Sequence, residues 1–121
     1  LYPAPMERPI SYHEFWPYYV REHATSRTRL LHFLGTSGVI VLAALAMILA
    51  DGWLLLAMPI SGYGFAWFAH AFVECNRPAT FTHPFWSLMG DFQMFAMMLT
   101  GRMDAEFERH KQGPHLDDLA K

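Results

Sequence analysis

Two long stretches without a charged side chain lie in the middle of the chain and constrain its fold more than any other feature. The first covers residues 33–50, and the second covers residues 53–73 if His70 is neutral. A helix needs about 18 or more consecutive apolar residues to span a bilayer. Asp51 and Gly52 separate the two stretches as a tight turn. The pattern predicts a helical hairpin that crosses a membrane twice; the alternative is the buried hairpin of a soluble all-α bundle.

Two further helices are expected beside the hairpin. Residues 11–23 carry aromatic side chains at spacings of three and four, and Ser11 with Glu14 forms a capping box at the start. Such an amphipathic N-terminal helix suits a membrane surface, or it packs on a protein core. A third apolar helix, about 84–101, begins at Pro84 and is interrupted by Asp91 and Gln93. It could cross the membrane, dip into it or lie on it.

The expected fold is therefore an all-α integral membrane bundle in a single domain, residues 1–121. Residues 10–105 form its core and residues 106–121 its polar tail, of which "GPHLDDLAK" is expected to be frayed. The opening "LYPAP" reads as the remainder of a trimmed or added segment.

Composition excludes several classes of protein. Hydrophobic residues make up 53% of the chain and charged residues 17%, whereas soluble domains average about 25% charged. The net charge of −2 gives no basic surface for nucleic acid. A lone cysteine, Cys75, allows no internal disulfide and no zinc site built from several cysteines.

The distribution of basic residues predicts an orientation. Four arginines precede the first span, Arg77 follows the second, and the turn at Asp51 has none. Lysine and arginine favour the cytoplasmic side, so both ends of the hairpin are expected to face the cytoplasm. The protein would then sit in the inner membrane if bacterial and in the endoplasmic reticulum if eukaryotic.

Four histidines fall where this hairpin begins and ends. His32 opens the first span, His70 lies near the end of the second, and His23 and His83 precede apolar helices. A double crossing brings all four to the same membrane boundary, which becomes the expected active-site side. Glu74 and Asp91 are expected close to these four histidines.

Spacing refines this expectation. His70 and Glu74 are four residues apart and share one face of a regular helix. His23 and His32 are nine apart, which puts them on opposite faces unless the chain breaks between them, and the cap at Thr25 and Ser26 provides that break. Imidazole and carboxylate ligands suit iron or zinc. The spacing leaves open whether these histidines bind a metal or are interfacial polar residues.

Two segments resemble a known family. "YVREHATSRTRLLHFLGT" (19–36) and "GYGFAWFAHAFVECNRPATF" (62–81) resemble the paired motifs of the 2-hydroxy fatty acid dioxygenases, which are small membrane proteins. The resemblance covers roughly residues 10–105. It implies a non-haem Fe(II) site and the α-oxidation of 2-hydroxy fatty acids by O2 to the fatty acid one carbon shorter.

The resemblance also implies roles for residues. By position, His23 and His32 match the first motif, and His70 and Glu74 the second. His83 is a fourth candidate metal ligand by its location alone. Glu74 is expected to bind the metal or to orient one of the histidines, and Arg77, Arg27 or Arg29 to hold the substrate carboxylate. The alternatives are a non-catalytic membrane protein that binds lipid or metal, and a zinc-dependent membrane hydrolase; the oligomeric state is left open.

Overall fold

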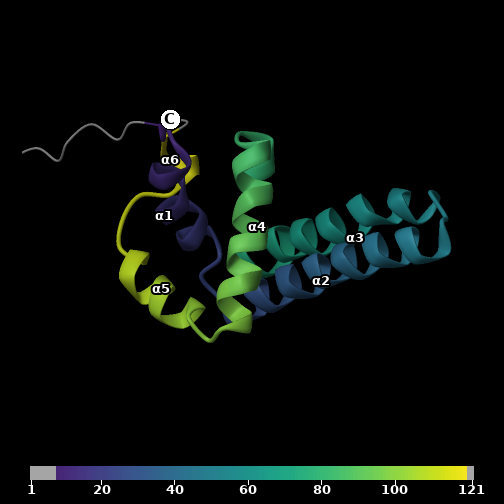
Figure 1. The fold of residues 1–121 in the computed structure, drawn as a ribbon. Coiled ribbons are helices and arrows are strands. Elements are labelled where there is room, and N and C mark those ends of the chain that lie inside the picture. The colour runs from purple at the N-terminus through teal and green to yellow at the C-terminus, as the bar shows by residue number, and fades with distance from the viewer. Residues whose placement is uncertain (1–7, 120–121) are drawn as a thin grey trace, which may run out of the picture.

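All regular structure among the described residues, 8–119 of this computed structural model, is helical, as the sequence predicts (Figure 1). The structure does not describe residues 1–7, which include the opening "LYPAP", or residues 120–121. The elements in chain order are α1 (Tyr12–Glu22), α2 (Ser26–Leu49), α3 (Leu54–Phe68), the π-helical turn η1 (Ala69–Glu74), the 3-10 turn η2 (Ala79–Phe81), α4 (Pro84–Leu99), α5 (Met103–His110) and α6 (Leu116–Leu119).

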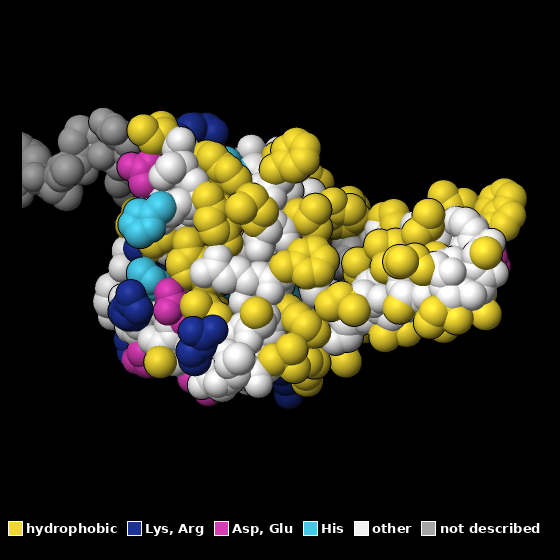
Figure 2. Space-filling model, in the orientation of Figure 1, with side chains coloured by type: hydrophobic (Ala, Val, Ile, Leu, Met, Phe, Trp, Pro, Cys, Tyr) yellow, Lys and Arg dark blue, Asp and Glu magenta, His cyan; other side chains and the backbone are white. Residues whose placement is uncertain are grey.

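Helices α2 and α3 form the expected hairpin, which projects as an arm from the rest of the molecule (Figure 1). Ser26–Leu49 and Leu54–Glu74 are both long and apolar enough to span a membrane. Only 22% and 17% of their apolar windows are buried, whereas the core helix of a soluble protein would be mostly buried. Hydrophobic side chains cover the arm, while charged side chains gather on the opposite end of the molecule (Figure 2).

The two spans begin and end close to their expected positions. The first starts earlier than residue 33 because the Thr25 hydroxyl accepts the Thr28 N–H and caps the helix at Ser26. At the tip, Ala50 adopts a left-handed conformation and the Asp51 carboxylate accepts the Trp53 N–H at 3.0 Å. Trp53 is exposed there.

The aromatic face of α1 packs inside the protein and not on a membrane surface. Phe15, Tyr19 and Val20 are fully buried and form a core with Met94 of α4 and Met103 of α5. The amphipathic N-terminal helix is confirmed, and its apolar face belongs to this core.

Helix α4 crosses the root of the hairpin (Figure 1) and stacks Phe95 on Phe33 of α2, with ring centroids 4.8 Å apart. Its 16 residues rise about 24 Å, less than the hydrocarbon core of about 30 Å. The described residues therefore contain two full-length candidate spans, and α4 is not among them.

The polar tail is held against α1 as far as Leu116, so the expectation that it frays is wrong for this part. The Arg21 guanidinium donates to the carbonyl oxygens of His110 and Pro114. The buried Glu22 carboxylate accepts the Leu116 N–H at 2.9 Å. These contacts fix the segment between α5 and α6 to the end of α1.

Close contact between the hairpin helices depends on Gly35. A Cβ atom built there would lie 2.9 Å from the Ser61 carbonyl oxygen and 3.1 Å from the Phe65 Cβ, neither of which can rotate away. Gly64, on the same hairpin, has open space instead.

We expect Gly35→Ala to destabilise the protein relative to Gly64→Ala. Both changes gain up to about 1 kcal/mol of helix propensity, but only the first overpacks the helix contact, at a cost of about 1–3 kcal/mol. Thermal unfolding in one detergent, followed by circular dichroism, measures the difference. Equal melting temperatures for the two variants would contradict the close contact.

Candidate metal centre

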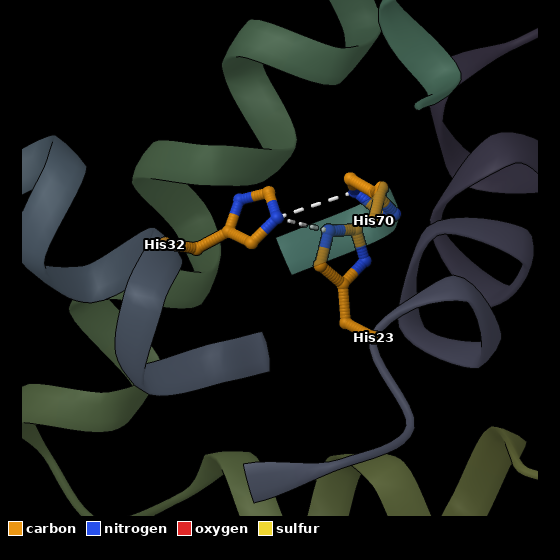
Figure 3. Close-up of side chains that lie close together, drawn as sticks. All are labelled: His23, His32 and His70. Atoms are coloured by element: carbon orange, nitrogen blue, oxygen red, sulfur yellow. Dashed lines mark hydrogen bonds between the residues drawn. The ribbon is translucent and has the colours of Figure 1, made fainter. Parts of the chain in front are cut away.

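The side chains of His23, His32 and His70 converge at the root of the hairpin, as Figure 3 shows. Their exposed fractions are 1%, 5% and 2%. The His32 Nε2 atom lies 3.1 Å from Nε2 of His23 and 3.2 Å from Nε2 of His70. One nitrogen from each ring falls within 4.8 Å of the other two. Residues that are far apart in the sequence thus form one compact three-nitrogen cluster.

His23 is the C-cap of α1, where the chain breaks before α2 as the spacing requires. Its Nδ1 lies 2.6 Å from the Tyr19 carbonyl oxygen, and its ring stacks on that of Tyr19 at 4.0 Å. The buried Arg29 guanidinium donates to the carbonyl oxygens of His23 and Ala24, which fixes the connecting loop. Burial lowers the pKa of His23 well below its usual range, and the imidazoles of His32 and His70 lower it further.

His32 points from the second turn of α2 toward α4. Its Nδ1 lies 3.3 Å from a carboxylate oxygen of Asp91, and the same oxygen accepts the hydroxyl of Tyr19. Burial and the Asp91 charge raise the pKa of Tyr19 well above its ordinary value, so this hydroxyl stays a donor. Gly90 makes room for the contact, because a Cβ atom there would lie 2.7 Å from the Tyr19 ring.

His70 lies in the π-helical turn η1, and the end of that turn supplies its partner. The left-handed Cys75 (φ 58°) reverses the chain and places the Asn76 side-chain oxygen 2.6 Å from His70 Nδ1. The Asn76 amide nitrogen donates in turn to the Glu22 carboxylate at 2.7 Å. Because the amide nitrogen faces a carboxylate, the amide oxygen must face His70, which makes His70 Nδ1 the proton donor.

Each Nδ1 atom therefore faces an oxygen acceptor: a carbonyl, a carboxylate or an amide oxygen. In a neutral imidazole the proton sits on the nitrogen that has such an acceptor, so the three Nε2 atoms carry lone pairs. Three lone pairs that face one another repel unless a positive charge lies between them. A shared proton or a metal ion would supply that charge.

The donor set fits a first-row metal. Metal–nitrogen distances of about 2.0–2.1 Å place two nitrogens on the same ion about 3.0–3.4 Å apart, and the two short separations fall in that range. Acceptors on Nδ1 are also the usual supports of metal-binding histidines. His23, His32 and His70 could therefore hold one metal ion.

Not every residue expected at the site joins this cluster. His83 is the N-cap of α4, where its Nδ1 contacts the Thr82 hydroxyl at 2.9 Å and its ring stacks on Trp86. It is outside the group whose ligand atoms lie within 4.8 Å of one another. The structure thus brings three of the four predicted ligands together.

Glu74 and Arg77 also lie outside the cluster. Glu74 accepts the Thr25 N–H at 2.6 Å and so ties the end of η1 to the start of α2. Arg77 is exposed, and its guanidinium lies 5.9 Å from the centroid of the Phe81 ring.

The supporting roles of three residues were not predicted from the sequence: Tyr19, Glu22 and Asn76. Asn76 follows a turn whose left-handed residue is a cysteine, not the glycine or asparagine that usually marks such a turn. Glu22 and Tyr19 read as ordinary members of an amphipathic helix. Their buried polar groups are evident only once α1 packs against the other helices.

Comparison with known proteins extends this description. Neither a curated protein nor a solved structure matches the chain. The family model described as 2-hydroxy-palmitic acid dioxygenase Mpo1-like matches residues 10–103, which include the three clustered histidines, Asp91 and Asn76. This match covers most of the chain, and the protein therefore belongs to the Mpo1-like family.

Proposed function

We propose that this protein is a membrane-embedded, Fe(II)-dependent dioxygenase that converts 2-hydroxy fatty acids to fatty acids one carbon shorter. The observation that carries the proposal is the convergence of three buried Nε2 atoms, whose Nδ1 partners leave their lone pairs available to a metal. The family name supplies the substrate class and the reaction type. His23, His32 and His70 would hold the iron.

The donor set suits this chemistry. Three neutral imidazoles leave coordination positions open, and a bound iron would supply the redox activation of O2 that breaking the C1–C2 bond requires. The protein's own contribution is to hold the three rings rigidly and to keep water away from them. Asp91 strengthens His32 as a ligand through Nδ1, and the Tyr19 hydroxyl orients Asp91.

The hairpin supports a membrane setting. Apolar side chains are exposed along both of its helices, a surface that water would solvate poorly. We propose that the arm inserts into a bilayer and that the cluster lies at the cytoplasmic boundary, as the arginines at the root of the hairpin favour. A fatty acid could then reach the site without leaving the lipid phase.

Loss of a single imidazole should abolish metal binding. We expect His70→Ala to retain less than a tenth of the wild-type iron after purification and reconstitution, while His13→Ala, at an exposed position, retains all of it. Metal analysis by mass spectrometry measures the content, and circular dichroism checks that both variants fold. His83→Ala distinguishes a three-histidine from a four-histidine ligand set, because its iron content falls only if His83 is also a ligand.

A zinc hydrolase is the rival reading, since three histidines also form catalytic zinc sites. We expect conversion of 2-hydroxyhexadecanoate to pentadecanoate to need Fe(II) and O2 and to stop under argon. Product analysis by mass spectrometry, with and without O2, decides between them. Turnover that persists without oxygen and is restored by zinc would refute the dioxygenase. Stoichiometric iron with no turnover would point to a non-catalytic metal-binding protein.

The neighbouring residues Asn76 and Arg77 should behave differently. Asn76→Ala removes the acceptor on His70 Nδ1, and loss of such a partner lowers metal affinity about 10–100-fold. Arg77→Ala should leave metal affinity unchanged and raise KM, because we propose that Arg77 binds the substrate carboxylate. Iron titration and steady-state kinetics measure the two effects. An unchanged KM in Arg77→Ala would remove the carboxylate role.

A further inference from the structure

A partly open groove of about 290 Å³ lies between α2, α3 and α4, beside the histidine cluster. Its volume is close to the lower end of the range for small-molecule sites, about 300 Å³. Asp91, Thr36 and Tyr63 supply its polar side chains, and the remainder of the lining is apolar or glycine, including Met58 and Val39.

The groove has a polar end and an apolar end. Asp91 contacts His32 Nδ1, and Thr36 is one helical turn beyond His32, so this end adjoins the cluster. Met58 precedes His70 by twelve residues, which places it about 18 Å further along the hairpin at 1.5 Å per residue. The apolar end therefore lies out along the arm that we propose to be in the membrane.

We propose that this groove binds the acyl chain of the substrate, with the carboxyl end at the histidines and the methyl end toward Met58. This inference rests on the proposed function and names the part of the protein that would set its chain-length preference. An amphiphile with one polar end matches the polarity of the groove.

The groove would select by shape and not by hydrophobic affinity. An acyl chain already in a bilayer gains little by moving onto another apolar surface, since lipid tails are as apolar as leucine. A chain that is too long or too bulky meets the groove wall and cannot bring its C1–C2 bond to the cluster. Side chains that narrow the groove should therefore change which substrates react, and iron content should stay the same.

A second cavity on the hairpin provides a comparison. It has about 350 Å³ and is lined by Leu31, Ile60, Gly64, Phe65 and Phe68. None of these side chains is polar, so this cavity resembles a surface for bulk lipid tails. Gly62 lies in the proposed groove and Gly64 in the second cavity, which makes substitutions at these two glycines a matched pair.

Photolabelling tests the location directly. The probes are 2-hydroxyhexadecanoic acids with a diazirine either near the middle of the chain or near the methyl end, added to the full chain in nanodiscs. We expect the first to label residues around Leu88 and Phe92 and the second to label Val39 or Met58. Excess unlabelled 2-hydroxyhexadecanoate should suppress both labels at least tenfold. Labelling that ignores the diazirine position, falls on Phe65 and Phe68, or resists competition would overturn the proposal.

Gly62→Leu supplies the functional test. A Cβ atom at Gly62 would already lie 3.3 Å from a Val39 methyl group, so a leucine there must extend into the groove or push against α2. We expect kcat/KM for 2-hydroxyhexadecanoate to fall about tenfold or more relative to 2-hydroxyoctanoate, a ratio within reach of shape selection in an apolar pocket. Gly64→Leu should keep the wild-type ratio.

Two further measurements keep the result interpretable. Iron content and circular dichroism establish whether Gly62→Leu is folded and contains iron. If Gly62→Leu fails to fold or to bind iron, Val39→Phe is used instead, because it narrows the same groove from α2. A wild-type ratio in the folded variant, or the shift appearing in Gly64→Leu instead, would overturn the groove assignment. Labelling does not need turnover, so absence of activity towards every 2-hydroxy acid would refute the proposed function and leave the labelling result standing.

Discussion

The site depends on hydrogen bonds to the outer nitrogens of three buried imidazoles. A neutral imidazole has one donor and one acceptor nitrogen, and burial makes an unsatisfied polar atom costly, about 1–3 kcal/mol. The Tyr19 carbonyl, the Asp91 carboxylate and the Asn76 amide remove that cost on one side of each ring. The opposite nitrogens are left directed at one another. Much of the surrounding architecture can be understood as a means of holding those three acceptors in place.

Three irregular features of the backbone place two of the rings and one of the acceptors. The break after α1 turns His23 toward the hairpin, the π-helical turn carries His70, and the left-handed Cys75 brings Asn76 back toward His70. π-Helical turns are frequent at functional sites, and residues with strained or left-handed backbone conformations are also concentrated there. Here each irregularity has an identifiable result, namely the position of one ring or of its partner.

The hairpin, the N-terminal helix and the clustering of three histidines could all be inferred from residue patterns. Uncharged runs and their separation by Asp51 and Gly52 report a helix pair directly, and a cap at Thr25 explains how His23 and His32 can meet. The contact of Glu74 with the Thr25 N–H could not be inferred, because it joins two segments that are 49 residues apart in the sequence. Asn76 and Glu22 were missed because their roles depend on contacts between distant segments. His83 was predicted as a fourth ligand, but its ring packs against the fully buried Phe15 ring, at a centroid distance of 5.2 Å. The packing of α1 against this residue could not be inferred from the spacing of residues along the chain.

Glu22 links the far end of the chain to the cluster. Its carboxylate accepts both the Leu116 N–H and the Asn76 amide, and Asn76 holds His70. The segment that follows residue 103 lies beyond the family match, yet it supplies one of the donors to this buried carboxylate. A chain cut at the family boundary would therefore expose Glu22 to solvent or leave its charge less well compensated, and that disturbance would reach His70 through a single side chain. In this protein, the contacts that support the three histidines extend past the end of the family match.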